Sequence, residues 1–219
     1  MKVKLQNVLP SEIEKRSFEI ISEELGSRTI DPVNEPVVKR VIHTSADFDY
    51  YDNLKFSEEA VKKGIAAIKA GACIVTDTKM AYSGVNKNVL ESFGGEAFCF
   101  MADEDVAEIA KKNGTTRATA SMDKAAALEK EGRPVIFAIG NAPTALVRLY
   151  ELIEEGKLSP ALIIGVPVGF VNVVESKELI METEVPYIVA QGRKGGSNVA
   201  AAICNAMLYM ARDEREKSK

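Results

Sequence analysis

Short, almost continuous apolar runs alternate with helix-length segments from residue 72 onwards. The runs cover 72–75, 97–100, 134–139, 161–164 and 186–190. Runs with so few polar positions are typical of strands that helices cover on both faces. Regular alternation of strand and helix predicts a parallel sheet with right-handed crossovers. The predicted fold class is therefore an α/β three-layer sandwich with a five-stranded, mostly parallel sheet in a flavodoxin-like order.

The segments between and before these runs carry helical patterns. Helices are expected over 103–112, 119–131, 143–155, 171–183 and 197–211. Before the first strand, Ser11–Gly26 has apolar residues at helical spacing, and Ser11 with Glu14 forms a capping box. Asp31 and Pro32 predict the N-cap and first residue of a helix that ends near the only histidine. Ser57 is expected to open a further helix.

Polar and glycine-rich segments follow the carboxyl ends of four predicted strands. These segments are 76–79, 140–144, 165–170 and 191–197. The loops at the opposite edge, such as 131–133 and 156–159, are ordinary by comparison. In open α/β sheets, ligands bind outside the carboxyl ends of the strands. The asymmetry predicts a binding site at that edge.

Composition narrows the class of protein. A length of 219 residues suits one domain, expected over 1–219. The net charge of −4 gives no overall basic field for nucleic acid, and no run approaches the ~20 apolar residues of a membrane span. Cys73, Cys99 and Cys204 lie in apolar or small-residue segments without a C-x-x-C, which favours reduced core cysteines over a disulfide or zinc site. We expect a soluble cytoplasmic protein with no nucleic-acid or membrane partner.

His43 is the only histidine and stands at a predicted helix end. An imidazole, with its reference pKa of ~6.5, can give or take a proton near neutral pH. A histidine in this place can equally do no more than bond the last helical carbonyls. A single histidine excludes a His-rich metal site, and no H-E-x-x-H is present. No metal is predicted.

Two loops at the predicted carboxyl edge could bind an anion. Gly192–Ser197 combines glycines, two cations and a helix start that Ser197 is expected to cap; a flexible basic loop is the alternative. Gly140–Thr144 offers Asn141 and a second helix start, or else a tight turn with Asn141 in a left-handed conformation. Neither loop is a G-x-x-x-x-G-K-[ST] or G-x-G-x-x-G motif, so nucleotide phosphate is not supported. The acids at 47, 49 and 52 indicate a solvated loop.

The chain resembles the precorrin-8X methylmutase family in several motifs, which occur in that family's order and cover about residues 10 to 210. The motifs are Arg16–Phe18, Arg40–His43, Gly140–Leu146, Gly165–Val171, Glu175–Lys177, Gly192–Arg193 and Gly195–Ser197. It departs at 118–120, where Ala-Thr-Ala replaces the more familiar Ser-Ala-Ala, and the loop 44–53 does not align.

The resemblance implies a three-layer α/β homodimer that acts on a tetrapyrrole carrying many carboxylates. The implied reaction moves a methyl group from C11 to C12 of precorrin-8X or cobalt-precorrin-8, giving hydrogenobyrinate or cobyrinate, without a cofactor. The family's catalytic histidine corresponds to His43, and its substrate-contacting serine to Ser17. Its Thr-Arg pair corresponds to Thr116 and Arg117.

The residues are adequate for such chemistry. A sigmatropic methyl shift needs a polarised π-system and good positioning, and one well-placed imidazole could supply the proton. Guanidinium groups suit a polycarboxylate because each can donate two parallel hydrogen bonds. The expected substrate-binding residues are Arg16, Ser17, Arg40, Thr116, Arg117, Asn141, Arg193, Gly195, Gly196 and Ser197, with Lys79 and Lys194 as further candidate cations.

Two other functions remain open from the sequence. A corrinoid carrier without catalysis could use the same cation-lined site, with His43 as a hydrogen-bond donor or axial ligand. A flavodoxin-like phosphate-binding module is disfavoured by the missing phosphate-loop motif. The sequence also leaves open whether the substrate carries cobalt.

Overall fold

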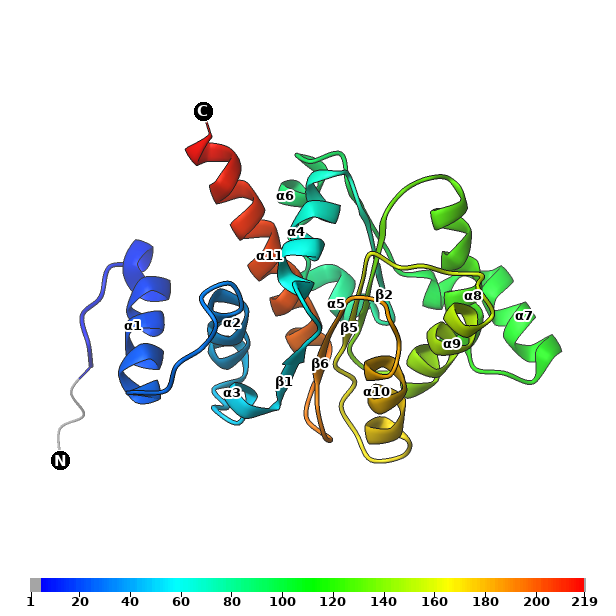
Figure 1. Cartoon of the computed structure of the whole chain (residues 1–219), viewed down its shortest axis with the longest axis horizontal. Coiled ribbons are helices and arrows are strands. Elements are labelled where there is room, and N and C mark those ends of the chain that lie inside the picture. The colour runs from blue at the N-terminus through cyan, green and yellow to red at the C-terminus, as the bar shows by residue number, and fades with distance from the viewer. Residues whose placement is uncertain (1–4, 219) are drawn as a thin grey trace.

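A mixed sheet forms the middle layer of the molecule (Figure 1). The computed structural model describes residues 5–218, and within them six strands hydrogen-bond in the order β1-β6-β5-β4-β2-β3. The strands are β1 Leu54–Phe56, β2 Cys73–Thr76, β3 Glu96–Phe98, β4 Val135–Ile139, β5 Leu162–Gly165 and β6 Tyr187–Ala190. Strands β2 to β6 are parallel, in the flavodoxin-like order that the sequence predicts.

The prediction of five strands missed β1. This strand pairs antiparallel with β6 at the sheet edge, where Leu54 lies opposite Ala190. Its three residues are too few to show a period of two, and only Leu54 is buried. The three-layer α/β class is confirmed, with one additional short edge strand.

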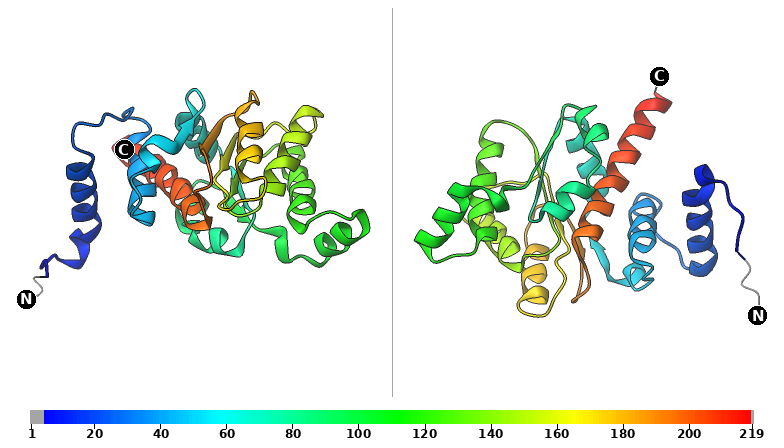
Figure 2. Two further views of the ribbon diagram at one scale, coloured as in Figure 1. Left: turned by 90° about the horizontal axis from the view of Figure 1, so that it is seen from below. Right: turned by 180° about the vertical axis from the view of Figure 1, so that it is seen from behind.

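Eleven α-helices and two 3₁₀ turns are found between residues 5 and 218. Their bounds are η1 Pro10–Glu12, α1 Ile13–Leu25, α2 Glu35–Ser45, α3 Tyr50–Asn53, α4 Ala60–Lys69, α5 Lys79–Gly84, α6 Lys87–Glu91, η2 Phe100–Ala102, α7 Glu104–Asn113, α8 Arg117–Lys130, α9 Pro143–Glu154, α10 Val173–Met181 and α11 Ser197–Lys217. Helices α8, α9 and α10 cover one face of the sheet, whereas α2, α4 and α11 lie on the other (Figures 1 and 2).

Alternate residues of the central strands supply the two cores. In β4, Ile136 and Ala138 belong to the core beneath α2, α4 and α11, while Phe137 and Ile139 belong to the core beneath α8 to α10. A Cβ atom on Gly64 of α4 would lie 2.6 Å from the sulfur of Met207, so this glycine lets α4 approach α11 closely. Packing on both faces explains the continuous apolar runs.

Three predicted helix starts are wrong in detail. Ser11 caps nothing, because Pro10–Glu12 forms a 3₁₀ turn before α1. The Asp31 carboxylate accepts the N–H groups of Val33 and Asn34, which closes a turn, and α2 begins only at residue 35. Ser57 accepts the N–H of Tyr187 through its hydroxyl oxygen, and α4 begins three residues later. The side chains of Asp31 and Ser57 thus satisfy backbone donors of a turn and a strand instead of a helix.

The three cysteines are buried and unpaired, as predicted. None of the helices between residues 5 and 218 is both long and apolar enough to cross a membrane. Helix α1 lies at one end of the long axis and α7 at the other, with α2 between α1 and the sheet (Figures 1 and 2).

Candidate functional site

His43 lies in the last turn of α2, with its side chain exposed. Val38, Val41 and Ile42 turn the apolar face of this helix into the core, and His43 therefore emerges at the surface. The helix ends at Ala46, which adopts a left-handed conformation with φ 52°. The buried face and this C-terminal turn together fix the position of the imidazole.

Two pockets meet at His43. One, of about 250 Å³, lies between α2, α5 and α11 and is also lined by Arg40, Asn198 and Asn205. The other, of about 230 Å³, lies between α1 and α2 and is lined by Ser17. The structure thus brings His43 together with two of the predicted substrate-binding residues, Ser17 and Arg40. The hydroxyl of Ser17 donates to the carbonyl of Ile13 at 2.9 Å.

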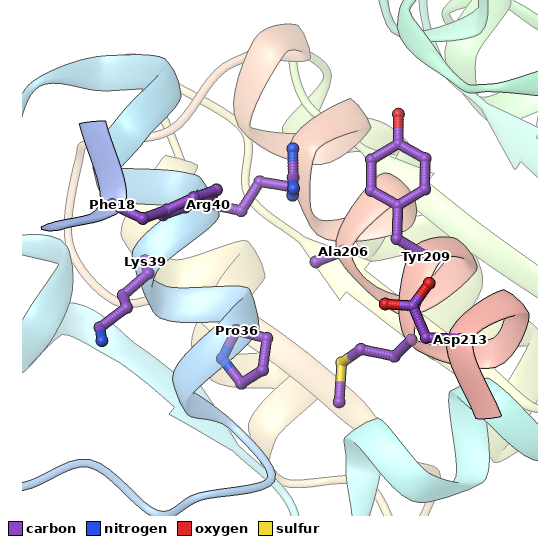
Figure 3. A pocket seen from close by; sticks show the side chains of 8 residues that line it. Phe18, Pro36, Lys39, Arg40, Ala206, Tyr209 and Asp213 are labelled. Carbon is purple, nitrogen blue, oxygen red and sulfur yellow. The ribbon is translucent and has the colours of Figure 1, made fainter. Parts of the chain in front are cut away.

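Arg40 is held between two aromatic rings. Its guanidinium carbon is 5.3 Å from the ring centre of Phe18 and 4.8 Å from that of Tyr209 (Figure 3). The Phe18 ring is in turn 5.3 Å from the His43 ring. Arg40 also donates to the Glu14 carboxylate at 2.8 Å. Arg40 also lines a third pocket, of about 290 Å³, and all three pockets are lined in part by residues of α2.

Arg16 is not part of this group. It donates to Glu19 and Glu23 of its own helix, at 3.2 Å each, and these bonds raise its pKa. It lines a separate hollow with Asn7 and Val8. Its charge is already matched by two carboxylates.

The loop that contains Asn141 is fixed by a buried carboxylate. Asp77, which follows β2, accepts the backbone N–H groups of Gly140, Asn141 and Ala142 at 2.9, 2.8 and 2.6 Å. Burial raises the pKa of the Asp77 carboxyl, and these N–H donors oppose that rise. Among the described residues, positive φ occurs outside glycine only at Ala46, Glu59 and Asn172, so the alternative of a left-handed Asn141 is wrong.

Thr116 and Arg117 lie beside this loop. Thr116 is the N-cap of α8 and accepts the N–H of Thr119, so the helix begins two residues earlier than predicted. The Thr116 hydroxyl also contacts that of Thr144, at 2.9 Å. Arg117 is exposed in the first turn of the helix. The structure therefore brings Thr116 to the Gly140–Thr144 segment that carries Asn141, and Arg117 is the next residue of the chain.

The Gly192–Ser197 loop packs tightly against its neighbours. The N–H of Gly196 donates to the Val166 carbonyl at 2.9 Å, and a Cβ atom on Gly195 would lie 2.1 Å from the same oxygen. Ser197 was predicted to cap α11, but the N-cap is Gly196. The Ser197 hydroxyl instead contacts that of Thr78 at 2.8 Å. Close backbone packing, which only glycine permits at position 195, decides this geometry.

The two cations of this loop differ. Lys194 donates to Asp47 and Asp49 at 2.5 and 2.6 Å, which raises the pKa of Lys194 and lowers that of Asp47. Two of the acids expected in a solvated loop are thus paired. The guanidinium of Arg193 lies 5.6 Å from the ring centre of Phe170, which is 80% exposed. Within residues 5–218, Lys194 therefore has two acidic partners and Arg193 has none.

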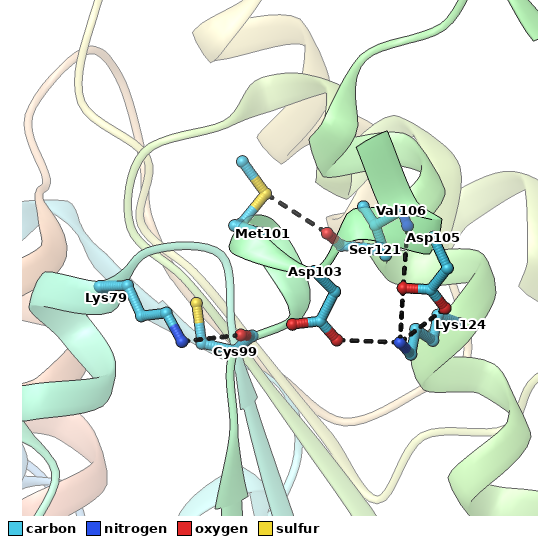
Figure 4. A network of polar contacts seen from close by, with 8 residues as sticks. All are labelled: Lys79, Cys99, Met101, Asp103, Asp105, Val106, Ser121 and Lys124. Atoms are coloured by element: carbon cyan, nitrogen blue, oxygen red, sulfur yellow. Dashed lines mark hydrogen bonds and ion pairs between the residues drawn. The ribbon is translucent and has the colours of Figure 1, made fainter. Parts of the chain in front are cut away.

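Lys79 is engaged elsewhere at the sheet edge. Its ammonium donates to the carbonyl of Cys99 at 3.4 Å, near the end of β3 (Figure 4). Beyond it, Lys124 of α8 pairs with Asp103 and Asp105 at 2.8 and 2.7 Å and ties α7 to α8. These contacts are structural.

Sequence reasoning missed the roles of two buried charges, Asp77 and Lys177. Lys177 is 0% exposed, and its ammonium donates to the carbonyls of Gly192 and Lys194 at 2.7 and 2.9 Å. Burial lowers its pKa to about 8. A signal existed, because Lys177 falls on the stripe of α10 that also contains the buried Val173 and Ile180.

Comparison with known proteins gives consistent matches. The sequence profile of the precorrin-8X methylmutase family matches residues 12–210. The chain is 48% identical to the cobalt-precorrin-8 methylmutase of Priestia megaterium, covering 93% of this chain and 89% of the relative. It is 46% identical to the protein of the same name from Salmonella typhimurium, covering 93% and 97%. A crystal structure of precorrin-8X methylmutase from Thermus thermophilus has a TM-score of 0.84 and 42% identity, covering 93% and 97%.

Proposed function

Because the chain belongs to the precorrin-8X methylmutase family, we propose that His43 handles the proton that drives its reaction. The protein is an isomerase of corrin (cobalamin) biosynthesis, which moves a methyl group from C11 to C12 of precorrin-8X or cobalt-precorrin-8 to give hydrogenobyrinate or cobyrinate. The proposal rests on one observation: the only imidazole is exposed between pockets that Ser17 and Arg40 also line.

His43 acts as a general acid and base. A proton given to a nitrogen or carbon of the macrocycle withdraws electron density and lowers the barrier to migration of the methyl group. After the shift the same imidazole takes a proton back. Ser17 lies on the opposite wall of the pocket between α1 and α2. Its hydroxyl forms a hydrogen bond with the substrate macrocycle.

The substrate carboxylates are bound by cations and backbone donors from two sides. Arg40 lies on the α2 side, and Arg193 and Arg117 lie along the sheet edge. Polar groups that assist them are Thr116, Asn141, Ser197 and the backbone of Gly195 and Gly196. Arg16 takes part only by exchanging Glu19 and Glu23 for a substrate carboxylate.

A second copy of the chain completes the site in a homodimer. The pockets at His43 have volumes of about 250 and 230 Å³, whereas pockets for drug-sized ligands measure about 300–1,000 Å³. Leu5, Leu9 and Ile13, on and before α1, are exposed apolar residues that a second copy could cover. Light scattering with size-exclusion chromatography should give twice the mass of the 23.8 kDa chain; a monomer would contradict the homodimer.

The substrate proposed is the cobalt form. The two relatives compared above, at 48% and 46% identity, are both named cobalt-precorrin-8 methylmutases. We further propose that residues 1–219 form one domain, although residues 1–4 and 219 lie outside the described part. A cytoplasmic location is supported by the three unpaired cysteines.

Visible spectroscopy tests the reaction and the substrate together. Purified protein is incubated with cobalt-precorrin-8 and, separately, with precorrin-8X. Formation of cobyrinate at the higher kcat/KM is expected. Faster formation of hydrogenobyrinate would overturn the proposal that the substrate carries cobalt. Tight binding without conversion would show that the protein is a corrinoid carrier and not an enzyme.

A further inference from the structure

Lys177 is a buried cation for which the structure shows no acidic partner between residues 5 and 218. Its side chain is fully enclosed, and its ammonium donates only to the backbone carbonyls of Gly192 and Lys194. Burying a charge away from water is costly unless it is well hydrogen-bonded. A methionine at this place would fill nearly the same volume without that cost. The ammonium therefore needs a reason beyond packing.

The segment that Lys177 contacts is rich in glycine, so its backbone has little conformational preference of its own. Gly192, Gly195 and Gly196 have φ of 83°, 159° and 141°, and glycine has more freedom to lose than any other residue. A loop with three such residues in five positions needs contacts from outside to keep one conformation. Two of these contacts come from Lys177. Two more are backbone bonds from Gly169 to Arg193 and from Gly196 to Val166.

The direction of these hydrogen bonds determines which polar groups of the loop face the surface. The carbonyls of Gly192 and Lys194 point inward to Lys177, and that of Arg193 accepts the N–H of Gly169. Oxygens that would repel a carboxylate are thereby turned away from the surface. The guanidinium of Arg193 stays outside, over Phe170, and the first N–H groups of α11 have no acceptor within their own helix.

We propose that Lys177 is a positioning residue for substrate binding, which orients the Gly192–Ser197 loop so that Arg193 and the start of α11 meet a substrate carboxylate. This inference rests on the proposed function, because it takes the ligand to be the carboxylate-bearing macrocycle. Lys177 itself does not touch the substrate. Its removal should therefore weaken binding more than it slows the chemical step.

The test compares K177M with K177R, and with S176A as a matched control. Ser176 is the neighbouring buried polar residue of α10, but its hydroxyl donates to the carbonyl of Val173 in its own helix. For K177M we expect a KM for cobalt-precorrin-8 raised about tenfold or more, with kcat within about threefold of wild type. The Kd for cobyrinate should rise in parallel. K177R keeps the donors and should recover most of the affinity, and S176A should match wild type.

A purely structural role would give a different result. A K177M enzyme with unchanged KM and Kd, or one that lost kcat and not affinity, would overturn the proposal. If K177M does not unfold cooperatively, the same measurements are made on K177Q, which keeps one N–H₂ donor. The same changes in KM and Kd would then support or overturn the proposal. If wild type and S176A also failed to convert the substrate, the proposed function itself would be lost and this inference with it.

Discussion

The loops at the carboxyl edge of the sheet and the pair of helices α1 and α2 both carry proposed site residues, but they are held in different ways. Asp77 and Lys177, both buried, each bind the backbone of one edge loop. Helix α1 buries only Ile21 and Leu25. An ion pair between Arg40 and Glu14, whose carboxylate is largely exposed, also joins α1 to α2. Buried charged side chains thus hold the edge loops, whereas few buried contacts hold α1.

The largest expected effect comes from removing the Asp77 carboxylate, which holds the backbone of the loop after β4. D77A leaves the N–H groups of Gly140, Asn141 and Ala142 without their acceptor, and the bond lost at Gly140 is buried. We expect the free energy of unfolding to fall by about 3–5 kcal/mol, measured by urea denaturation. Asp52, an exposed acid in α3, is the control, and D52A should change the free energy of unfolding by less than about 0.5 kcal/mol. Equal effects of the two variants would refute the assigned role of Asp77.

A smaller effect tests the close packing of the second edge loop. G195A places a methyl group 2.1 Å from the Val166 oxygen at a φ of 159°, so the loop must shift. We expect the free energy of unfolding, determined from the melting temperature and enthalpy, to fall by about 2–4 kcal/mol. Gly114, at φ 63° with nothing within 4 Å of a Cβ, is the matched control, and G114A should cost about 1 kcal/mol. A G195A protein as stable as G114A would mean that the loop adapts freely.

The pH dependence of stability sharpens the comparison further. Burial lowers the pKa of Lys177 to about 8 in the folded protein, from 10.5. Between these values the unfolded chain binds more protons, so the unfolding free energy of wild type should rise with pH relative to K177M. The expected gain is of the order of 1–3 kcal/mol from pH 8 to 10.5, by urea denaturation at several pH values. If the difference in unfolding free energy between wild type and K177M stayed constant over this pH range, Lys177 would not titrate there.

The smallest effect is expected at α1. E14Q removes the carboxylate that pairs with Arg40, the cation proposed to bind substrate. Exposed ion pairs contribute about 0.2–1 kcal/mol, so the KM for cobalt-precorrin-8 should fall by about 1.4-fold to fivefold. E59Q, which removes the exposed partner of Lys62 in α4 instead, should leave KM unchanged. A rise in KM with E14Q would mean that the pair with Glu14 holds Arg40 in its binding position.

Apolar periodicity predicted the five parallel strands and the three layers, because those strands are buried on both faces. It could not reveal β1, whose three residues form only at the edge of an existing sheet. The motifs brought attention to His43, Ser17 and Arg40, which do meet at adjoining pockets. They gave no reason to separate Arg193 from Lys194, since the pairing of Lys194 with Asp47 and Asp49 depends on two loops far apart in sequence.

The claim that His43 carries the proton is tested most directly by measuring turnover and binding of one variant. H43A should keep the fold and bind cobyrinate with a Kd near that of wild type, because His43 lies on the exposed side of α2. Its conversion of cobalt-precorrin-8, followed by visible spectroscopy, should fall by about 10²–10⁴-fold. Turnover by folded H43A at a rate close to that of wild type would contradict the account.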